Sequence, residues 1–180
     1  PFFKKMENYQ GNTSELRGEE GPLKVSEVND RNPIYDAIFK CGEVNNIPFN
    51  KDYNGEDQEG LGYTQTTIYK GERMSAEVAY LRPIKSRKNL TIITNSLVTK
   101  LLFEKKKCIG VEVKNKNKLS TFMTSKEVIL SGGAINSPQI LELSGIGNSS
   151  ILKKNGIEPI HHLVGVGENL RDHIAPRIIY

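Results

Sequence analysis

A short apolar run that ends in two glycines is the central feature of the hydrophobic pattern. Residues 127–130 have the length and apolar character of a strand buried in a sheet. Gly132 and Gly133 follow, and residues without a Cβ atom let a backbone approach a ligand closely. Open α/β sheets bind nucleotide cofactors at such turns. The pattern predicts either a cofactor turn or a turn that needs glycine only for its geometry.

The residues after these glycines predict a short helix. Ser137 suits the N-cap, and Pro138 suits the first helical position, where its nitrogen needs no donor. The helix is expected over residues 139–143, with Gly145 just past its end. The whole stretch therefore predicts a strand, a glycine turn and a helix.

An upstream stretch, Pro33–Val44, predicts an amphipathic helix with Asn32 as its cap. Four of its apolar residues recur at helical spacing, and we expect them to face a core: Ile34, Ala37, Ile38 and Cys41. Further helices are expected over residues 75–81, capped by Ser75, and over residues 149–155, ended by Gly156. Alternating or β-branched segments predict strands at residues 23–26, 61–69, 90–94, 97–103, 109–113, 119–124 and 157–162.

Composition places the chain among globular proteins. It has 180 residues, 37% of them hydrophobic and 26% charged, and no apolar run long enough to predict a membrane span. Residues 61–180 are basic, but their lysines lie at turns and do not alternate with aromatic residues, so we expect no nucleic-acid binding. The chain opens at Pro1 without a signal peptide, and we expect an internal fragment of a longer protein.

Three other candidate sites have weaker patterns. Cys41 and Cys108 form no C-x-x-C pair, so metal ligation is not expected, and a disulfide between them stays open. The acidic loop at residues 52–62 lacks EF-hand spacing, which favours a solvated turn over a calcium site. His161 and His162 are neighbours in an expected strand, so they point to opposite faces and cannot converge on one substrate.

Longer strings around these elements resemble the glucose-methanol-choline (GMC) flavin oxidoreductases. Residues 133–147 resemble the second signature of that family, G-A-x-x-S-P-x-I-L-x-x-S-G-I-G in this chain. Residues 71–81 are similar to its G-x-R-x-S-x-x-x-A-Y-L segment, and residues 164–173 to its V-G-x-N-L-x-D-H segment. Residues 95–102 resemble the entry to the flavin domain. Residues 17–23 resemble the R-G-x-x-G-P-L string of the insect-type glucose dehydrogenase branch.

The resemblance implies an α/β fold, α+β overall, that combines part of a Rossmann-like FAD-binding domain with part of an antiparallel-sheet substrate domain. Residues 1–90 would belong mainly to the substrate domain and connecting segments. Residues 91–160 would form the C-terminal part of the FAD-binding domain. Residues 161–180 would begin the next substrate-domain segment.

The resemblance also implies an FAD site. Val98 is expected to meet the adenine through its backbone, and His173 to position the flavin rather than act as the base. The other residues implied for FAD are Gly132, Gly133, Ala134, Ser137, Asn169 and Asp172. The family's dinucleotide motif would lie before Pro1 and its catalytic histidine after Tyr180, so this chain alone is expected to be inactive and to retain no FAD.

The implied reaction passes a hydride from the CH–OH group of an alcohol or sugar to flavin N5, with an unknown electron acceptor. The compartment stays open, although the resemblance is compatible with secretion. One alternative is an NAD-type Rossmann unit in which Glu158 holds the ribose. That carboxylate lies inside its expected strand rather than at the strand end, which disfavours this alternative. The second alternative is a GMC homologue that has no catalytic activity.

The first prediction concerns solubility. The strand expected at residues 127–130 would lack its central neighbours, and an unpaired apolar edge promotes aggregation. We therefore expect residues 1–180, expressed alone, to be poorly soluble or molten. Amide hydrogen exchange tests this: slow exchange across residues 127–130 in a soluble monomer would show an independent domain and contradict the prediction.

Overall fold

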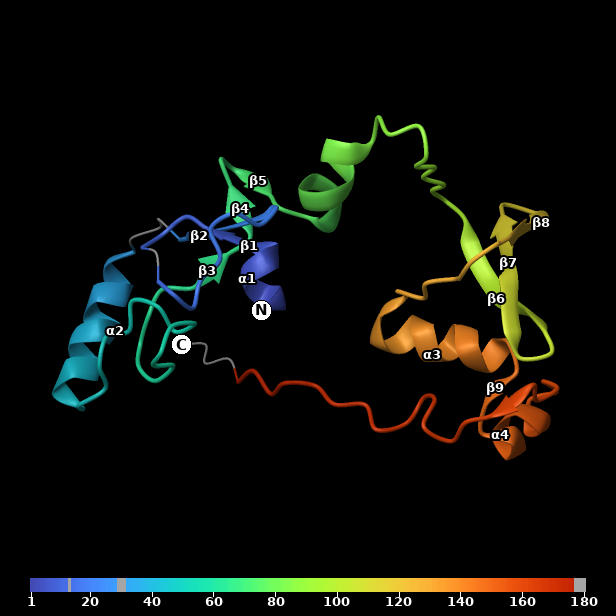
Figure 1. Cartoon of the computed structure of the whole chain (residues 1–180). Helices are drawn as coiled ribbons and strands as arrows, with labels where there is room; N and C mark the ends of the chain where they lie inside the picture. The colour runs from blue at the N-terminus through green and yellow to red at the C-terminus, as the bar shows by residue number, and fades with distance from the viewer. Residues whose placement is uncertain (13, 29–31, 177–180) are drawn as a thin grey trace. The chain divides into compact units, whose positions relative to one another are not determined.

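The computed structural model describes residues 1–12, 14–28 and 32–176, and it divides the chain into two compact units, Pro1–Thr91 and Ile92–Tyr180 (Figure 1). Both helices and strands occur in each unit, so the mixed α/β class is confirmed. Within the described ranges, no helix is both long enough and apolar enough to cross a bilayer. The expected assignment of residues 1–90, 91–160 and 161–180 to substrate and flavin domains stays a prediction.

The first unit is built on a small sheet of three strands, in the order β1 (Glu7–Tyr9), β2 (Leu23–Glu27) and β3 (Gln65–Thr66). β1 runs parallel to β2, and β3 runs antiparallel to it. The helix α1 (Phe2–Met6) precedes this sheet. A hairpin of β4 (Ile68–Tyr69) and β5 (Glu72–Arg73) follows it. The strand expected at residues 61–69 is therefore shorter than predicted and is interrupted at Thr67.

The helix α2 (Pro33–Val44) has the predicted bounds, and the Asn32 side chain accepts the Ile34 N–H at 3.1 Å as its cap. The predicted buried stripe is wrong, because Ile34 is 45% exposed and Ala37 and Cys41 are exposed too, with Ile38 half-buried. The helix packs through the aromatic side chain of Phe39 instead. The Phe39 ring meets those of Phe49 and Tyr63, at centroid distances of 4.8 and 4.9 Å.

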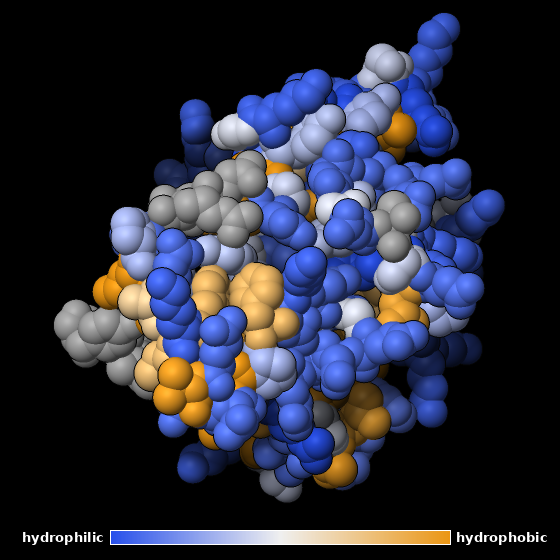
Figure 2. Space-filling view, turned by 90° about the vertical axis from the view of Figure 1, so that its left-hand side faces the viewer, coloured by the Kyte–Doolittle hydropathy of each residue, from blue (hydrophilic) through white to orange (hydrophobic). Residues whose placement is uncertain are grey.

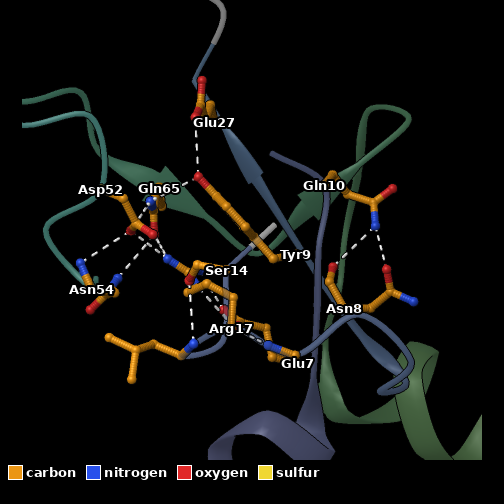
Figure 3. Close-up of polar contacts among 12 residues, drawn as sticks. Glu7, Asn8, Tyr9, Gln10, Ser14, Arg17, Glu27, Asp52, Asn54 and Gln65 are labelled. Atoms are coloured by element: carbon orange, nitrogen blue, oxygen red, sulfur yellow. Dashed lines mark hydrogen bonds and ion pairs between the residues drawn. The ribbon is translucent and has the colours of Figure 1, made fainter. Parts of the chain in front are cut away.

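A buried arginine joins the strands of the first unit to its acidic loop (Figure 3). The Arg17 guanidinium pairs with Glu7 at 2.5 Å and with Asp52 at 2.6 Å, and it donates to Gln65 at 3.0 Å. It also lies 3.7 Å from the centre of the Tyr9 ring. Burial alone would lower the pKa of Arg17, but the hydrogen bond and charge of Glu7 and the charge of Asp52 raise it. The loop that suggested a calcium site therefore has its first carboxylate committed to this cation.

Other predictions in the first unit are corrected. The N-cap of the next helix is Ala76 rather than Ser75, although the Ser75 hydroxyl still accepts the Val78 N–H at 3.2 Å. The helix is a π-helix over Glu77–Leu81, followed by a 3-10 turn over Arg82–Ile84. Residues 90–94 are not a strand, because they follow the Pro83 turn and pair with no described strand.

The second unit contains a three-stranded antiparallel sheet in the order β6 (Leu97–Glu104), β7 (Lys107–Asn115) and β8 (Lys118–Met123). These strands agree with the predictions at 97–103, 109–113 and 119–124. The helix α3 (Gly133–Leu143) follows, and α4 (Ser149–Lys154) lies between the short parallel strands β9 (Ile146–Gly147) and β10 (His161–His162).

Two predicted strands of this unit are wrong or reduced. Residues 127–130 pair with no described strand, and Ile129 is 78% exposed, because no neighbouring strand of the unit is available to cover this run. The strand expected at residues 157–162 is reduced to its last two residues, which face only the two residues of β9.

Large apolar side chains lie at the surface in both units. Figure 2 shows orange hydrophobic patches among the blue hydrophilic surface on the side that it presents. Among the described residues, the buried apolar side chains are few: Tyr9, Ala79, Leu101, Val113 and Leu152. Polar contacts therefore provide many of the interactions that hold the elements of each unit together.

The second prediction follows from the burial of Tyr9. Burial first, and then the hydroxyl's hydrogen bond to Glu27 at 3.1 Å, raise its pKa from 10.0 to about 12. Because the folded protein holds this proton more tightly, the stabilisation is complete below pH 10.0 and is lost as the pH rises through about 12. An ultraviolet difference titration of the wild type against Tyr9→Phe measures the shift. An ordinary tyrosine titration in that difference would contradict it, and Glu27→Gln should retain the part due to burial.

Candidate functional site

The eight residues implied for cofactor binding all lie in the second unit. Val98 is half-buried on β6, and four residues lie at the start of α3: Gly132, Gly133, Ala134 and Ser137. The other three, Asn169, Asp172 and His173, are exposed in the extended segment after β10. The helix start and this segment are therefore the two parts whose geometry matters.

The helix start differs from the prediction. α3 begins at Gly133 rather than after Ser137, so Ser137 is not its N-cap and Pro138 lies inside the helix. Ser137 instead accepts the Gly132 N–H with its hydroxyl at 3.0 Å, which folds the glycine turn back on the first helical turn. Pro138 is the sixth residue of α3 and lies beyond the first turn, so its missing N–H removes one intrahelical hydrogen bond.

Gly133 has the backbone conformation that favours glycine. Its φ is +82°, and a Cβ atom built on it would find no atom of the protein within 4 Å. The space over this glycine is open, so the backbone of the turn is accessible from outside. This is the condition for the close approach of a ligand that the sequence predicted.

A hollow of about 620 Å³ lies between α3 and the segment after β10. Its lining comes from both parts and includes Ala134, Ser137, Glu142, Gly167, Glu168 and Leu170. Two of the predicted residues are thus brought together with the neighbours of a third, Asn169. The other six predicted residues do not line this hollow: Val98, Gly132, Gly133, Asn169, Asp172 and His173.

The segment that closes the hollow has two residues with a positive φ, Gly167 at +79° and Asn169 at +59°. A Cβ atom on Gly167 would lie 3.3 Å from a carboxylate oxygen of Glu142 on α3. The segment therefore passes next to the end of the Glu142 side chain at this glycine.

His162 has a structural partner. Its Nδ1 accepts the Ser149 backbone N–H at 3.1 Å and lies 3.0 Å from the Ser149 hydroxyl oxygen, at the start of α4. The imidazole thus holds the first turn of α4, and its nitrogen is already occupied by a backbone donor. The argument from the sequence that the two histidines are not a catalytic pair stays a prediction.

Sequence reasoning missed two residues that organise these parts. Arg17 was noted only as part of a motif that resembles the family, and Ser144 only as part of the family's second signature. Both are buried, 4% and 5% exposed respectively, and both bond to partners far along the chain. A buried polar residue leaves no periodic signal, so only the family strings marked their positions.

The model of the family "GMC oxidoreductase" matches residues 1–175. The chain belongs to the GMC oxidoreductase family. The strings recognised in the sequence therefore identified the family correctly, and the GMC chain has the mixed α/β architecture expected for it. The family match excludes the NAD-type alternative, and Glu158 lies before β10 rather than inside a strand as expected.

Two curated relatives show how much of a GMC protein this chain represents. It is 45% identical over 174 residues to the mitochondrial choline dehydrogenase of Homo sapiens, covering 97% of the chain and 29% of that protein. It is 46% identical over 176 residues to the oxygen-dependent choline dehydrogenase of Staphylococcus aureus, covering 97% of the chain and 31% of that protein. The GMC chain thus spans less than a third of these relatives.

The chain also corresponds to about a third of the length of the solved structures that it matches. The chain matches an FAD-dependent oxidoreductase from Chaetomium thermophilum with a TM-score of 0.87 and 31% identity, over 96% of this chain and 32% of that one. It matches pyridoxine 4-oxidase from Mesorbium loti with a TM-score of 0.83 and 27% identity, over 90% and 32%. The fold of the GMC chain is therefore that of a segment of these oxidoreductases.

The third prediction separates two glycines that follow helices of the GMC chain. Gly145 and Gly156 have φ values of +84° and +73°, so alanine at either costs about 1–2 kcal/mol of backbone strain. At Gly145 the new Cβ atom would also lie 2.6 Å from the Glu158 carbonyl oxygen, whereas at Gly156 it meets nothing within 4 Å. Gly145→Ala should therefore speed amide hydrogen exchange of β9 and β10 much more than Gly156→Ala. Equal effects would contradict the crowding at Gly145.

Proposed function

We propose that this chain is a segment of an FAD-dependent oxidoreductase that oxidises the CH–OH group of an alcohol. The observation that carries the proposal is the open glycine turn at the start of α3, beside a hollow large enough for part of a dinucleotide, within a GMC segment. The match to an FAD-dependent oxidoreductase over nearly the whole chain supports it. When bound, the flavin would accept the hydride at N5.

The residues of the second unit fit the adenosine side of FAD. Gly133 leaves its backbone open to a ligand, and Ser137 fixes the turn through Gly132. We assign Ala134 and Ser137 to the wall of the hollow, and the Val98 backbone to the adenine. These groups would bind and orient the cofactor, since none of them is placed to move a proton.

The segment after β10 is assigned to the other side of the cofactor. Asn169 has a left-handed backbone that directs the chain past the hollow, and Asp172 accepts the His173 N–H at 2.9 Å. We propose that Asn169, Asp172 and His173 contact FAD, with His173 in a positioning role. The base that takes the alcohol proton is not assigned to any residue of this chain.

The substrate we propose is a choline-type alcohol. The two curated relatives above are named for choline, and each is about as similar to this chain as the other. The sequence had suggested the insect-type glucose dehydrogenase branch on residues 17–23, but most of that string surrounds the buried Arg17, whose partners are structural. Sugars are therefore the second class to test, and the electron acceptor stays open.

The experiment uses the full-length protein that contains this chain. Purified protein should hold FAD in a one-to-one ratio and lose its flavin absorbance when choline is added without oxygen. Residues 1–180 alone, mixed with FAD and passed over a sizing column, should retain none. Flavin reduced by glucose and not by choline would overturn the substrate, and full-length protein without bound flavin would overturn the function.

The fourth prediction tests Gly133. In the full-length protein, Gly133→Val should abolish FAD binding, because a branched side chain would fill the open space over the turn. Gly156→Val is the matched control, since this glycine also has a positive φ and open space but lies after α4. Flavin content per protein measures both variants. Full flavin occupancy in Gly133→Val, or equal loss in the control, would leave Gly133 with a structural role only.

A further inference from the structure

Ser144 makes two hydrogen bonds at the end of α3, one buried and one part-buried. Its hydroxyl donates to the Ile140 carbonyl at 2.5 Å and accepts the Leu101 backbone N–H at 2.8 Å. The residue is only 5% exposed, so water does not compete for these bonds. The serine therefore joins the last turn of the helix to a strand 43 residues earlier in the chain.

The strand that it holds is an edge strand. β6 pairs with β7 on one side, and β8 lies beyond β7, so the other side of β6 has no described strand beside it. An edge strand presents backbone N–H groups that need partners. The Leu101 N–H finds its partner in Ser144, and Figure 1 shows the last turn of α3 beside the β6–β7 hairpin. Register shifts interrupt the pairing of β6 on both sides of Leu101, where the strand is free to bend towards the helix.

Ser144 thereby links the two walls assigned to the adenosine. Val98 lies on β6, three residues before Leu101, and the Gly133 turn lies at the opposite end of α3. A helix of this length spans about 16 Å, with Pro138 in its interior. The Ser144 bond at its far end is consequently one of the contacts that set how the glycine turn is presented to the strand that carries Val98, and it is the one made to that strand's backbone.

We propose that Ser144 is a positioning residue for the adenosine part of FAD. The inference rests on the proposed function, since it needs a cofactor that contacts both Val98 and the Gly133 turn. A ligand held between two elements binds tightly only if their spacing is set before it arrives. Without the hydroxyl, the Leu101 N–H is left buried without a partner, and α3 loses this link to β6.

The test uses the full-length apoprotein and measures the dissociation constants of FAD and of ADP, which carries the adenosine without the flavin. Ser144→Ala should weaken both about tenfold, the effect of one buried hydrogen bond. At saturating FAD, the flavin spectrum should equal that of the wild type, because the flavin itself is not displaced. The matched control is Ser150→Ala, an exposed serine on α4, which should leave both constants unchanged.

The outcomes separate this inference from the proposed function. Wild-type protein that binds neither FAD nor ADP overturns the proposed function. Wild-type binding of both, with unchanged constants and only a lower melting temperature in Ser144→Ala, overturns the positioning role alone. If Ser144→Ala does not fold, hydrogen exchange in the wild type decides: ADP should slow exchange of the Leu101 amide, and an unchanged rate overturns the inference.

Discussion

The scarcity of buried apolar side chains is the constraint on which the rest of this structure depends. Only five hydrophobic residues of the described chain are buried, so neither unit has a large core to hold its elements in place. Buried polar groups take over this role, and each must be fully bonded, because an unpaired one costs more than a bond contributes. Arg17 satisfies this with two carboxylates in the first unit, and Ser144 with two backbone groups in the second. No described buried side-chain nitrogen or oxygen lacks a partner.

Periodicity predicted which residues are apolar but not what covers them. The stripe on α2 and the run at residues 127–130 have the patterns of buried elements, yet Ile34 and Ile129 lie open to solvent. An apolar pattern reflects burial in the whole protein. This chain spans less than a third of the length of its curated relatives. Exposed apolar faces of this kind are typical of surfaces that another part of a fold covers. The sequence therefore identified the apolar residues of these elements correctly. The errors in the predicted core concern which segments cover those residues.

Local signals predicted elements well where the cause is local. The Asn32 cap and the glycine at the end of α3 each act within a few residues, and each is found as predicted. The start of α3 was misplaced for the opposite reason: Ser137 and Pro138 form a good local start signal, but the helix continues upstream of them to the flexible Gly133. The contacts of Arg17 and Ser144 join residues 35 and 43 positions apart, which no local pattern encodes. The residues of the candidate site could be predicted from the sequence. The hollow, and the segment that borders it, could be recognised only in the fold.

Gly133 and Gly145 show that residues of the same type in one family signature can have different roles. Both adopt nearly the same backbone conformation, with φ values of +82° and +84°, and both border the same helix. A side chain at Gly133 would enter open space, whereas one at Gly145 would strike the backbone of residue 158. The first glycine therefore leaves room for something outside the chain, and the second leaves room for the chain itself. The helix between them connects a surface available to a ligand with a corner fixed by packing, and Ser144 bonds that corner to β6.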